Sequence, residues 1–132
     1  MCGIGGMVDY GDGLLQEDTV QRMLKSLERR GTHQGGVFSS ENVQLLHRRL
    51  CVVDMENGCQ PMQTGEEKPP CTLVYNGELY NTPELRNELE ASGVTFHGHL
   101  DTEVLLKACQ TIFVWDAIGR KNQKMRRHPA VY

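Results

Sequence analysis

Gly3-Ile4-Gly5-Gly6-Met7-Val8-Asp9 is a run of small and apolar residues that predicts a β-strand near the start of the chain. After a turn, apolar side chains recur at Val20, Met23, Leu24 and Leu27. Their spacing of i, i+3, i+4 and i+7 places these side chains on one face of a helix. The chain therefore opens with a strand and an amphipathic helix, whose apolar face needs a sheet or another helix to cover it.

Capping residues mark the ends of two predicted helices. Asp18 and Gln21, three residues apart, resemble a capping box at the start of the first helix. Gly31 suits the position just past the C-cap of that helix. Thr82-Pro83 predicts the start of a second helix, with Thr as N-cap and Pro at the first helical position, and Gly93 closes it.

Short apolar stretches between these signals predict the remaining elements. We expect strands over residues 37–39, 43–47, 50–54, 71–75, 94–97 and 112–115, and a third helix over 102–109. Ser40-Glu41-Asn42 is expected to join two of the strands as a hairpin. The strands occur in clusters with helices between them, which favours an α+β fold over strict βαβ repetition.

Size and composition indicate one ordinary globular domain. The 132 residues are 39% hydrophobic and 23% charged, which suits a single domain with a buried core. No apolar run approaches the roughly 20 residues that span a bilayer, and no signal peptide is apparent. We therefore expect a cytoplasmic protein with no membrane partner.

Charge and cysteine usage argue against a nucleic-acid-binding protein and against a protein held together by disulfides or a metal. The net charge is −3, and residues 120–127 carry five basic side chains without an acidic one. We expect this run to be a solvated tail, since no nucleic-acid-binding motif accompanies it, and we expect no nucleic-acid partner. The five cysteines are odd in number and lack C-x-x-C spacing, so we expect neither a disulfide framework nor a metal site.

Cys2 is the candidate nucleophile. Removal of Met1 would leave Cys2 with a thiol and a free α-amine on one residue. An N-terminal residue that uses its own amine as general base is a recognised way to activate a nucleophile. A cysteine after an initiator Met is more often only a small residue that permits removal of the Met. Cys2 therefore needs support from other residues.

Four other stretches carry groups of suitable chemistry. Arg49 lies in an apolar run and needs an anionic partner, and its planar fork suits a carboxylate. Asn76-Gly77 offers a side-chain amide beside a backbone N–H, as an oxyanion hole requires. Glu78 and Asp101 supply negative charge, and residues 30–36 form a glycine-rich loop. Taken singly, each has a simpler explanation: a salt-bridged strand residue, a hairpin turn, an N-cap and a loop.

Taken together, these groups describe a small ligand. A thiol would attack a carbonyl, and Asn76 and Gly77 would hold the oxyanion that develops. Arg49 would bind a carboxylate, while Glu78 and Asp101 would hold an ammonium group. A molecule with a carboxylate, an ammonium group and an amide open to attack is an amino-acid amide, and L-glutamine fits.

The motifs also carry a family resemblance. Residues 1–109 resemble the N-terminal glutaminase domain of glutamine-hydrolysing asparagine synthetases, a class II glutamine amidotransferase of the N-terminal-nucleophile (Ntn) hydrolase superfamily. The matching stretches, in the order and at the spacing of the family, are Met1–Ile4, Arg30-Gly31, His47–Asp54, Gln60–Met62, Tyr75–Asn81 and Asp101–Leu106. The resemblance implies an αββα four-layer sandwich, here incomplete at the C-terminal end.

The resemblance implies a role for each matching residue. Cys2 would form a γ-glutamyl thioester, with Asn76 and Gly77 as the oxyanion hole. Glutamine would be bound by a segment that begins with Arg49 on its α-carboxylate, and by two acidic residues on its α-amino group. The implied substrate-binding residues are Arg49, Leu50, Cys51, Val52, Val53, Asn76, Gly77, Glu78 and Asp101. The implied reaction is hydrolysis of glutamine to glutamate and ammonia.

The resemblance also sets expectations for domains and partners. We expect a partial glutamine amidotransferase domain over 1–110 and a divergent or compressed segment over 111–132, from an internal deletion or from an unrelated tail. No cofactor is expected, because ATP and Mg²⁺ belong to the synthetase domain, which is missing here; a separate synthetase subunit would accept the ammonia. Missing strands would favour a homodimer. The alternative function is a non-catalytic remnant that binds glutamine or another protein.

Overall fold

The computed structural model describes residues 2–11, 16–50, 58–65 and 70–119, with backbone alone for 113–119. Along the chain the elements alternate between strands and helices in clusters, which confirms an α+β fold. None of the helices in these described residues is long and apolar enough to cross a membrane. The predicted strand over 50–54 falls mostly on residues 51–57, which lie outside the described ranges.

The largest sheet has three antiparallel strands. β1 (Gly3–Val8) and β2 (Gln34–Ser39) both pair with the central strand β3 (Val43–Arg49). The register places Gly3 opposite Arg48 and Gln34 opposite Arg49. The amide of Ser40 donates to the carbonyl of Val43 across 2.8 Å, which confirms the predicted hairpin. This register brings the start of β1 beside the end of β3.

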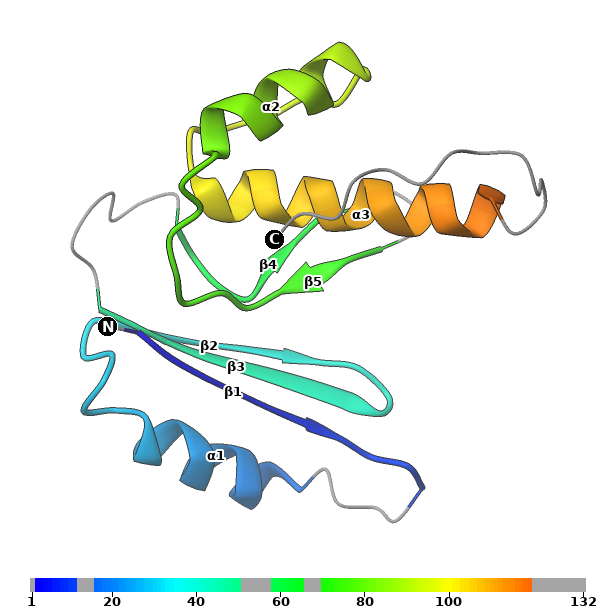
Figure 1. The fold of residues 1–132 in the computed structure, drawn as a ribbon. Coiled ribbons are helices and arrows are strands. Elements are labelled where there is room, and N and C mark those ends of the chain that lie inside the picture. Colours follow the sequence, from blue (N-terminus) through cyan, green and yellow to red (C-terminus); the bar gives the residue numbers. More distant parts are fainter. Residues whose placement is uncertain (1, 12–15, 51–57, 66–69, 120–132) are drawn as a thin grey trace.

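Helix α1 (Glu17–Ser26) covers one face of this sheet (Figure 1). Its Val20 is buried, and Gly3 of β1 lets the end of the helix approach closely: a Cβ on Gly3 would lie 3.1 Å from the Cβ of Leu27, the C-cap residue. The helix is as predicted, but the capping box is wrong, because Gln16 is the N-cap and makes no side-chain cap hydrogen bond. Gly31 is also not the C′ residue. Gly31 is required for a different reason: a Cβ at this position would overlap the backbone carbonyl of Arg48.

A second, two-stranded sheet lies on the other face. β4 (Met62–Gln63) pairs antiparallel with β5 (Thr72–Leu73), a shorter strand than the predicted 71–75. The pairing is extended by Thr64, whose amide donates to the Cys71 carbonyl at 3.0 Å. The Cys71 amide returns a bond to the Thr64 hydroxyl at 2.9 Å. These bonds give a very short sheet a defined register.

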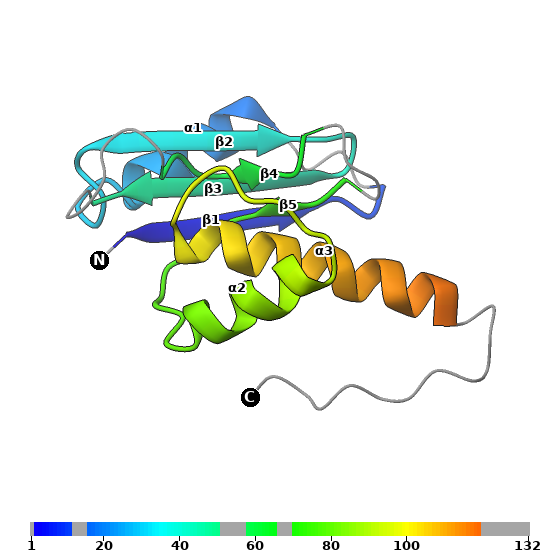
Figure 2. The same cartoon turned by 90° about the horizontal axis from the view of Figure 1, so that it is seen from above.

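Helices α2 (Thr82–Ala91) and α3 (Asp101–Gly119) lie beyond the second sheet, against each other (Figures 1 and 2). Their contact buries Leu89, Val104 and Ala108. Gly93 follows the C-cap of α2 with φ of 89°, as predicted. The N-cap is Asn81 rather than Thr82, although the proline lies in the first turn as expected.

Two predicted strands are wrong. Residues 94–97 form no strand; Val94 and Phe96 pack against the helix cluster as single apolar contacts instead. Residues 112–115 belong to α3, which continues to Gly119. A short apolar run does not distinguish a strand from a buried helical segment. Here the helix that begins at Asp101 continues through residues 112–115.

Candidate active site

Cys2 lies at the end of the central strand. The amide of Leu50 donates a hydrogen bond to the Cys2 Sγ at 3.4 Å, and the Cys2 thiol donates in turn to the Leu50 carbonyl at 3.8 Å. Cys2 is half-buried, and Leu50 follows the last residue of β3. Antiparallel pairing of β1 with β3 therefore brings together two predicted site residues that are 48 positions apart.

Arg49 is the last residue of β3 and is buried, with 8% of its surface exposed. Its guanidinium group lies directly against Gly58: a Cβ on that glycine would be 2.7 Å from the Arg49 Cζ. The Arg49 carbonyl accepts a hydrogen bond from the amide of His33 at 3.1 Å. The strand end thus carries a buried cation one residue before Leu50, which contacts the Cys2 thiol, and the planar fork of this cation suits a carboxylate.

His47 is a site neighbour that sequence reasoning did not assign. It is 1% exposed, and burial lowers its pKa below the ordinary value, with the charge of Arg49 lowering the pKa further. A hydrogen bond to the backbone of Tyr75 opposes this shift in the pKa of His47. Residues two apart on a strand face the same side, so the spacing from Arg49 could have indicated this position.

Tyr75 begins the predicted oxyanion loop, residues 75–78. Its amide donates to the Gln60 Oε1 at 2.6 Å, and its ring covers Gly77, where a Cβ would lie 2.8 Å from the phenolic oxygen. Burial raises the pKa of Tyr75, and the negative charges of Asp101 and Glu78 raise it further. The loop, both predicted acidic residues and the Tyr75 hydroxyl are therefore neighbours.

Asp101 is the first residue of α3 rather than its N-cap. Its Oδ2 accepts a hydrogen bond from the amide of Leu79 at 3.3 Å, directly after Glu78. The carboxylate thus fixes the far side of the oxyanion loop. Asn76, Gly77 and Glu78 themselves are exposed, which leaves them open to a ligand.

The predicted site residues form two groups. The first is Cys2, Arg49 and Leu50 at the end of the three-stranded sheet, and the second is the loop 75–78 with Asp101. His47 and Gln60 connect the groups, since both bond to Tyr75. Both views place the N-terminal end of β1 and the β5–α2 link at the same end of the molecule (Figures 1 and 2). Cys51, Val52 and Val53 lie outside the described residues.

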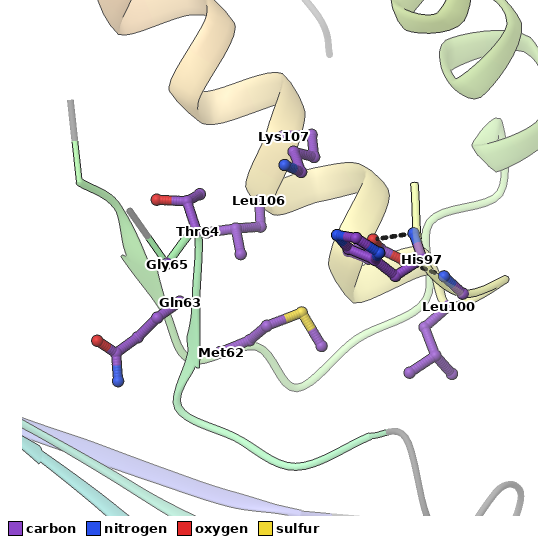
Figure 3. Close-up of a pocket in the computed structure, with 10 residues that line it drawn as sticks. Met62, Gln63, Thr64, Gly65, His97, Leu100, Leu106 and Lys107 are labelled. Atoms are coloured by element: carbon purple, nitrogen blue, oxygen red, sulfur yellow. Dashed lines mark hydrogen bonds between the residues drawn. The ribbon is translucent and has the colours of Figure 1, made fainter. Parts of the chain in front are cut away.

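A pocket of about 340 Å³ lies elsewhere, between β4, the segment before α3 and α3 itself (Figure 3). Glu103 closes one wall of this pocket, because its two carboxylate oxygens accept the amides of His97 at 2.7 Å and Gly98 at 2.8 Å. None of the predicted site residues lines it. Within the described ranges, no group of three or more His, Cys, Asp or Glu side chains is arranged to hold a metal ion.

Comparison with known proteins defines the class. The glutamine amidotransferase domain family matches residues 1–118, and the chain belongs to this family. Over 107 residues it is 48% identical to asparagine synthetase [glutamine-hydrolyzing] 3 of Bacillus subtilis, covering 80% of this chain and 17% of that protein. It is 40% identical to asparagine synthetase [glutamine-hydrolyzing] 1 of the same organism, with the same coverage of both chains, and 34% identical to asparagine synthetase B of Escherichia coli, covering 83% of this chain and 20% of that protein. The chain is thus a glutamine amidotransferase domain similar to those of glutamine-hydrolysing asparagine synthetases.

Proposed function

We propose that this chain hydrolyses L-glutamine to glutamate and ammonia through a thioester on Cys2. The observation that carries the proposal is the placement of the Cys2 thiol against the backbone of Leu50, the residue that follows the buried Arg49. A nucleophile beside a fixed carboxylate-binding group is the arrangement that attack on an amino-acid side-chain amide requires. The similarity to glutamine-hydrolysing synthetases supports the same chemistry.

The proposed mechanism uses groups of this chain alone. With Met1 removed, the α-amine of Cys2 takes the thiol proton, and the thiolate attacks the amide carbon of glutamine. The side-chain amide of Asn76 and the N–H of Gly77 stabilise the tetrahedral oxyanion. Collapse breaks the C–N bond, and the departing nitrogen takes the proton and leaves as ammonia. Water then cleaves the thioester, releasing glutamate and restoring the thiol.

Substrate orientation follows from the charges around the site. Arg49 binds the α-carboxylate of glutamine, helped by the segment from Leu50 to Val53, while Glu78 and Asp101 hold its α-ammonium group. The support for this orientation is the separation of charge: a buried cation at the strand end, and two carboxylates beside Tyr75. Together with the oxyanion donors on the side-chain amide, these two ionic contacts of opposite sign hold glutamine at three points, which distinguishes one enantiomer of an α-amino acid from the other.

The proposal extends to fold class, partners and location. The order helix, sheet, sheet, helices in Figure 1 supports an Ntn-hydrolase sandwich. The chain spans about a fifth or less of the length of these relatives. We propose that a synthetase partner, with its own ATP and Mg²⁺, uses the ammonia and that no cofactor binds to the glutaminase domain. A second copy of the chain is a further proposed partner. Free thiols at Cys2, Cys59, Cys71 and Cys109 support a cytoplasmic location.

Glutamate release tests the proposal. The purified chain, with Met1 removal verified by mass spectrometry, is incubated with glutamine, and Cys2→Ala is the matched control. The expected result is glutamate formation by the unaltered chain and none above background by Cys2→Ala. A folded chain with a free Cys2 amine that releases no more glutamate than Cys2→Ala would overturn the proposal and favour a non-catalytic module.

A further inference from the structure

A short segment links the two groups of site residues. Residues 58–61, which we term the bridge segment, pass directly over the three-stranded sheet. The Gln60 carbonyl occupies the place that a Cβ on Gly36 of β2 would take, and Gly58 lies against the Arg49 guanidinium. The bridge segment is therefore packed onto β2 and β3 with no space for side chains at these two glycines.

Gln60 extends from the bridge segment to the oxyanion loop. Its Oε1 accepts the amide proton of Tyr75 at 2.6 Å, across 15 positions of sequence, and Gln60 is half-buried. Tyr75 lies outside β5, which ends at Leu73, so its amide has no place in the strand ladder. The Gln60 side chain therefore supplies the hydrogen-bond acceptor for the Tyr75 amide. Tyr75 directly precedes Asn76 and Gly77 in the sequence.

We propose that Gln60 is a positioning residue that fixes the Asn76-Gly77 oxyanion loop relative to Arg49. This inference rests on the proposed glutaminase function. Oxyanion donors act only when they are preorganised around the position that the charge will occupy. One end of Gln60 is fixed by the bridge segment beside Arg49, and its other end holds the amide before the donors. His47 holds the backbone of Tyr75 from β3 as well.

The position of this contact predicts a particular kinetic signature. The oxyanion develops in the transition state, so misplaced donors reduce kcat and leave substrate binding largely unchanged. A merely structural role for Gln60 would instead reduce the amount of folded enzyme and leave kcat per folded molecule unaltered. A small displacement of catalytic groups costs up to about 100-fold in rate.

Three variants test the inference. Gln60→Leu removes the acceptor, Gln60→Glu keeps an acceptor oxygen, and Gln63→Leu removes an exposed glutamine of β4 as the matched control. We expect Gln60→Leu to lower kcat for glutamate release by about 10- to 100-fold with KM changed by less than about twofold. Gln60→Glu should recover most of kcat, and Gln63→Leu should match the unaltered chain. Unchanged kcat in folded Gln60→Leu, or loss expressed only in KM, would overturn the inference.

Amide hydrogen exchange provides a readout that does not need activity. We expect faster exchange at Tyr75, Asn76 and Gly77 in Gln60→Leu, and no change in Gln63→Leu. If the unaltered chain releases no glutamate but exchange responds in this way, the glutaminase function fails and the loop-positioning role stands. If the unaltered chain is active and exchange is the same in all variants, the positioning role alone fails. Should Gln60→Leu not fold, Gln60→Asn retracts the acceptor by one methylene and serves in its place.

Discussion

The backbone amide of Leu50 donates a hydrogen bond to the Sγ of Cys2 across 3.4 Å. This contact exists because Gly3 is paired with Arg48, so that the same register places Cys2 opposite Arg49 and its thiol reaches the amide of Leu50, the residue after β3. A one-residue slip of β1 along β3 would reverse the faces of its side chains and move Cys2 away from this position. The location of the proposed nucleophile is therefore a consequence of strand register.

Gly58→Ala should weaken glutamine binding. A Cβ at this position would overlap the Arg49 guanidinium, which must then move from its observed position. We expect KM for glutamine to rise about tenfold or more, since a hydrogen bond to a charged group contributes about 1.5–3 kcal/mol. Steady-state kinetics of glutamate release measures the change.

Gly5→Ala is the matched control for this substitution. Its Cβ would meet Met23, Leu27 and Leu46 at 3.4–3.6 Å, which is ordinary van der Waals contact. The control should retain the KM of the unaltered chain. Equal KM values for Gly58→Ala and the unaltered chain would show that Arg49 does not bind substrate in its observed position.

His47 should make stability depend on pH. Its pKa is lowered in the folded chain by burial and by Arg49, so the unfolded chain binds the proton more tightly. When the pH falls below about 6.5, the ordinary pKa of histidine, unfolding is accompanied by uptake of a proton. The free energy of unfolding therefore decreases as the pH decreases. We expect the urea midpoint to decrease over this range.

His47→Gln removes the titrating group and should flatten this part of the pH profile. His99→Gln, at an exposed histidine, should retain the slope of the unaltered chain. The same slope in all three proteins would assign the pH dependence to other groups.

Glu103→Gln should destabilise the start of α3. Both carboxylate oxygens of Glu103 accept backbone amides, from His97 at 2.7 Å and Gly98 at 2.8 Å. A glutamine side chain offers one acceptor oxygen and one NH2 donor group. The amide of either His97 or Gly98 would then face a donor instead of an acceptor. We expect a loss of about 1–3 kcal/mol in the free energy of unfolding, measured by urea denaturation.

Glu90→Gln is the control for Glu103→Gln. Its carboxylate forms an exposed ion pair with Arg86 at 3.0 Å, a type of contact that contributes about 0–1 kcal/mol. Equal stability losses in the two variants would contradict the role assigned to the paired Glu103 contacts.

The sequence predicted those elements whose signals are local. The run of small and apolar residues in β1, the apolar face of α1 around Val20 and the turn at Ser40 were enough to predict three elements. The stretches over 94–97 and 112–115 were misassigned because four residues are too few to show a reliable period, and tertiary packing decided their structure.

The sequence was enough to predict the site residues that belong to motifs, but not the hydrogen bonds that connect these residues. Cys2, Arg49, Asn76 and Asp101 stand in recognisable stretches. Gln60 also lies in a matching stretch, residues 60–62, but the sequence does not show its role, because that role lies in a hydrogen bond to Tyr75 that depends on how a loop crosses the sheet. Contacts of this kind follow from the fold and are not encoded in local spacing.

Acid-quenched mass spectrometry of the chain mixed with glutamine detects the proposed thioester on Cys2 itself. The chain is digested after the quench, and the peptide that carries Cys2 is compared with those that carry the other cysteines. We expect a γ-glutamyl group on Cys2 alone, lost on treatment with hydroxylamine and absent from Cys2→Ala. Glutamate release without an adduct on Cys2, or an adduct on the exposed Cys59 instead, would contradict this expectation.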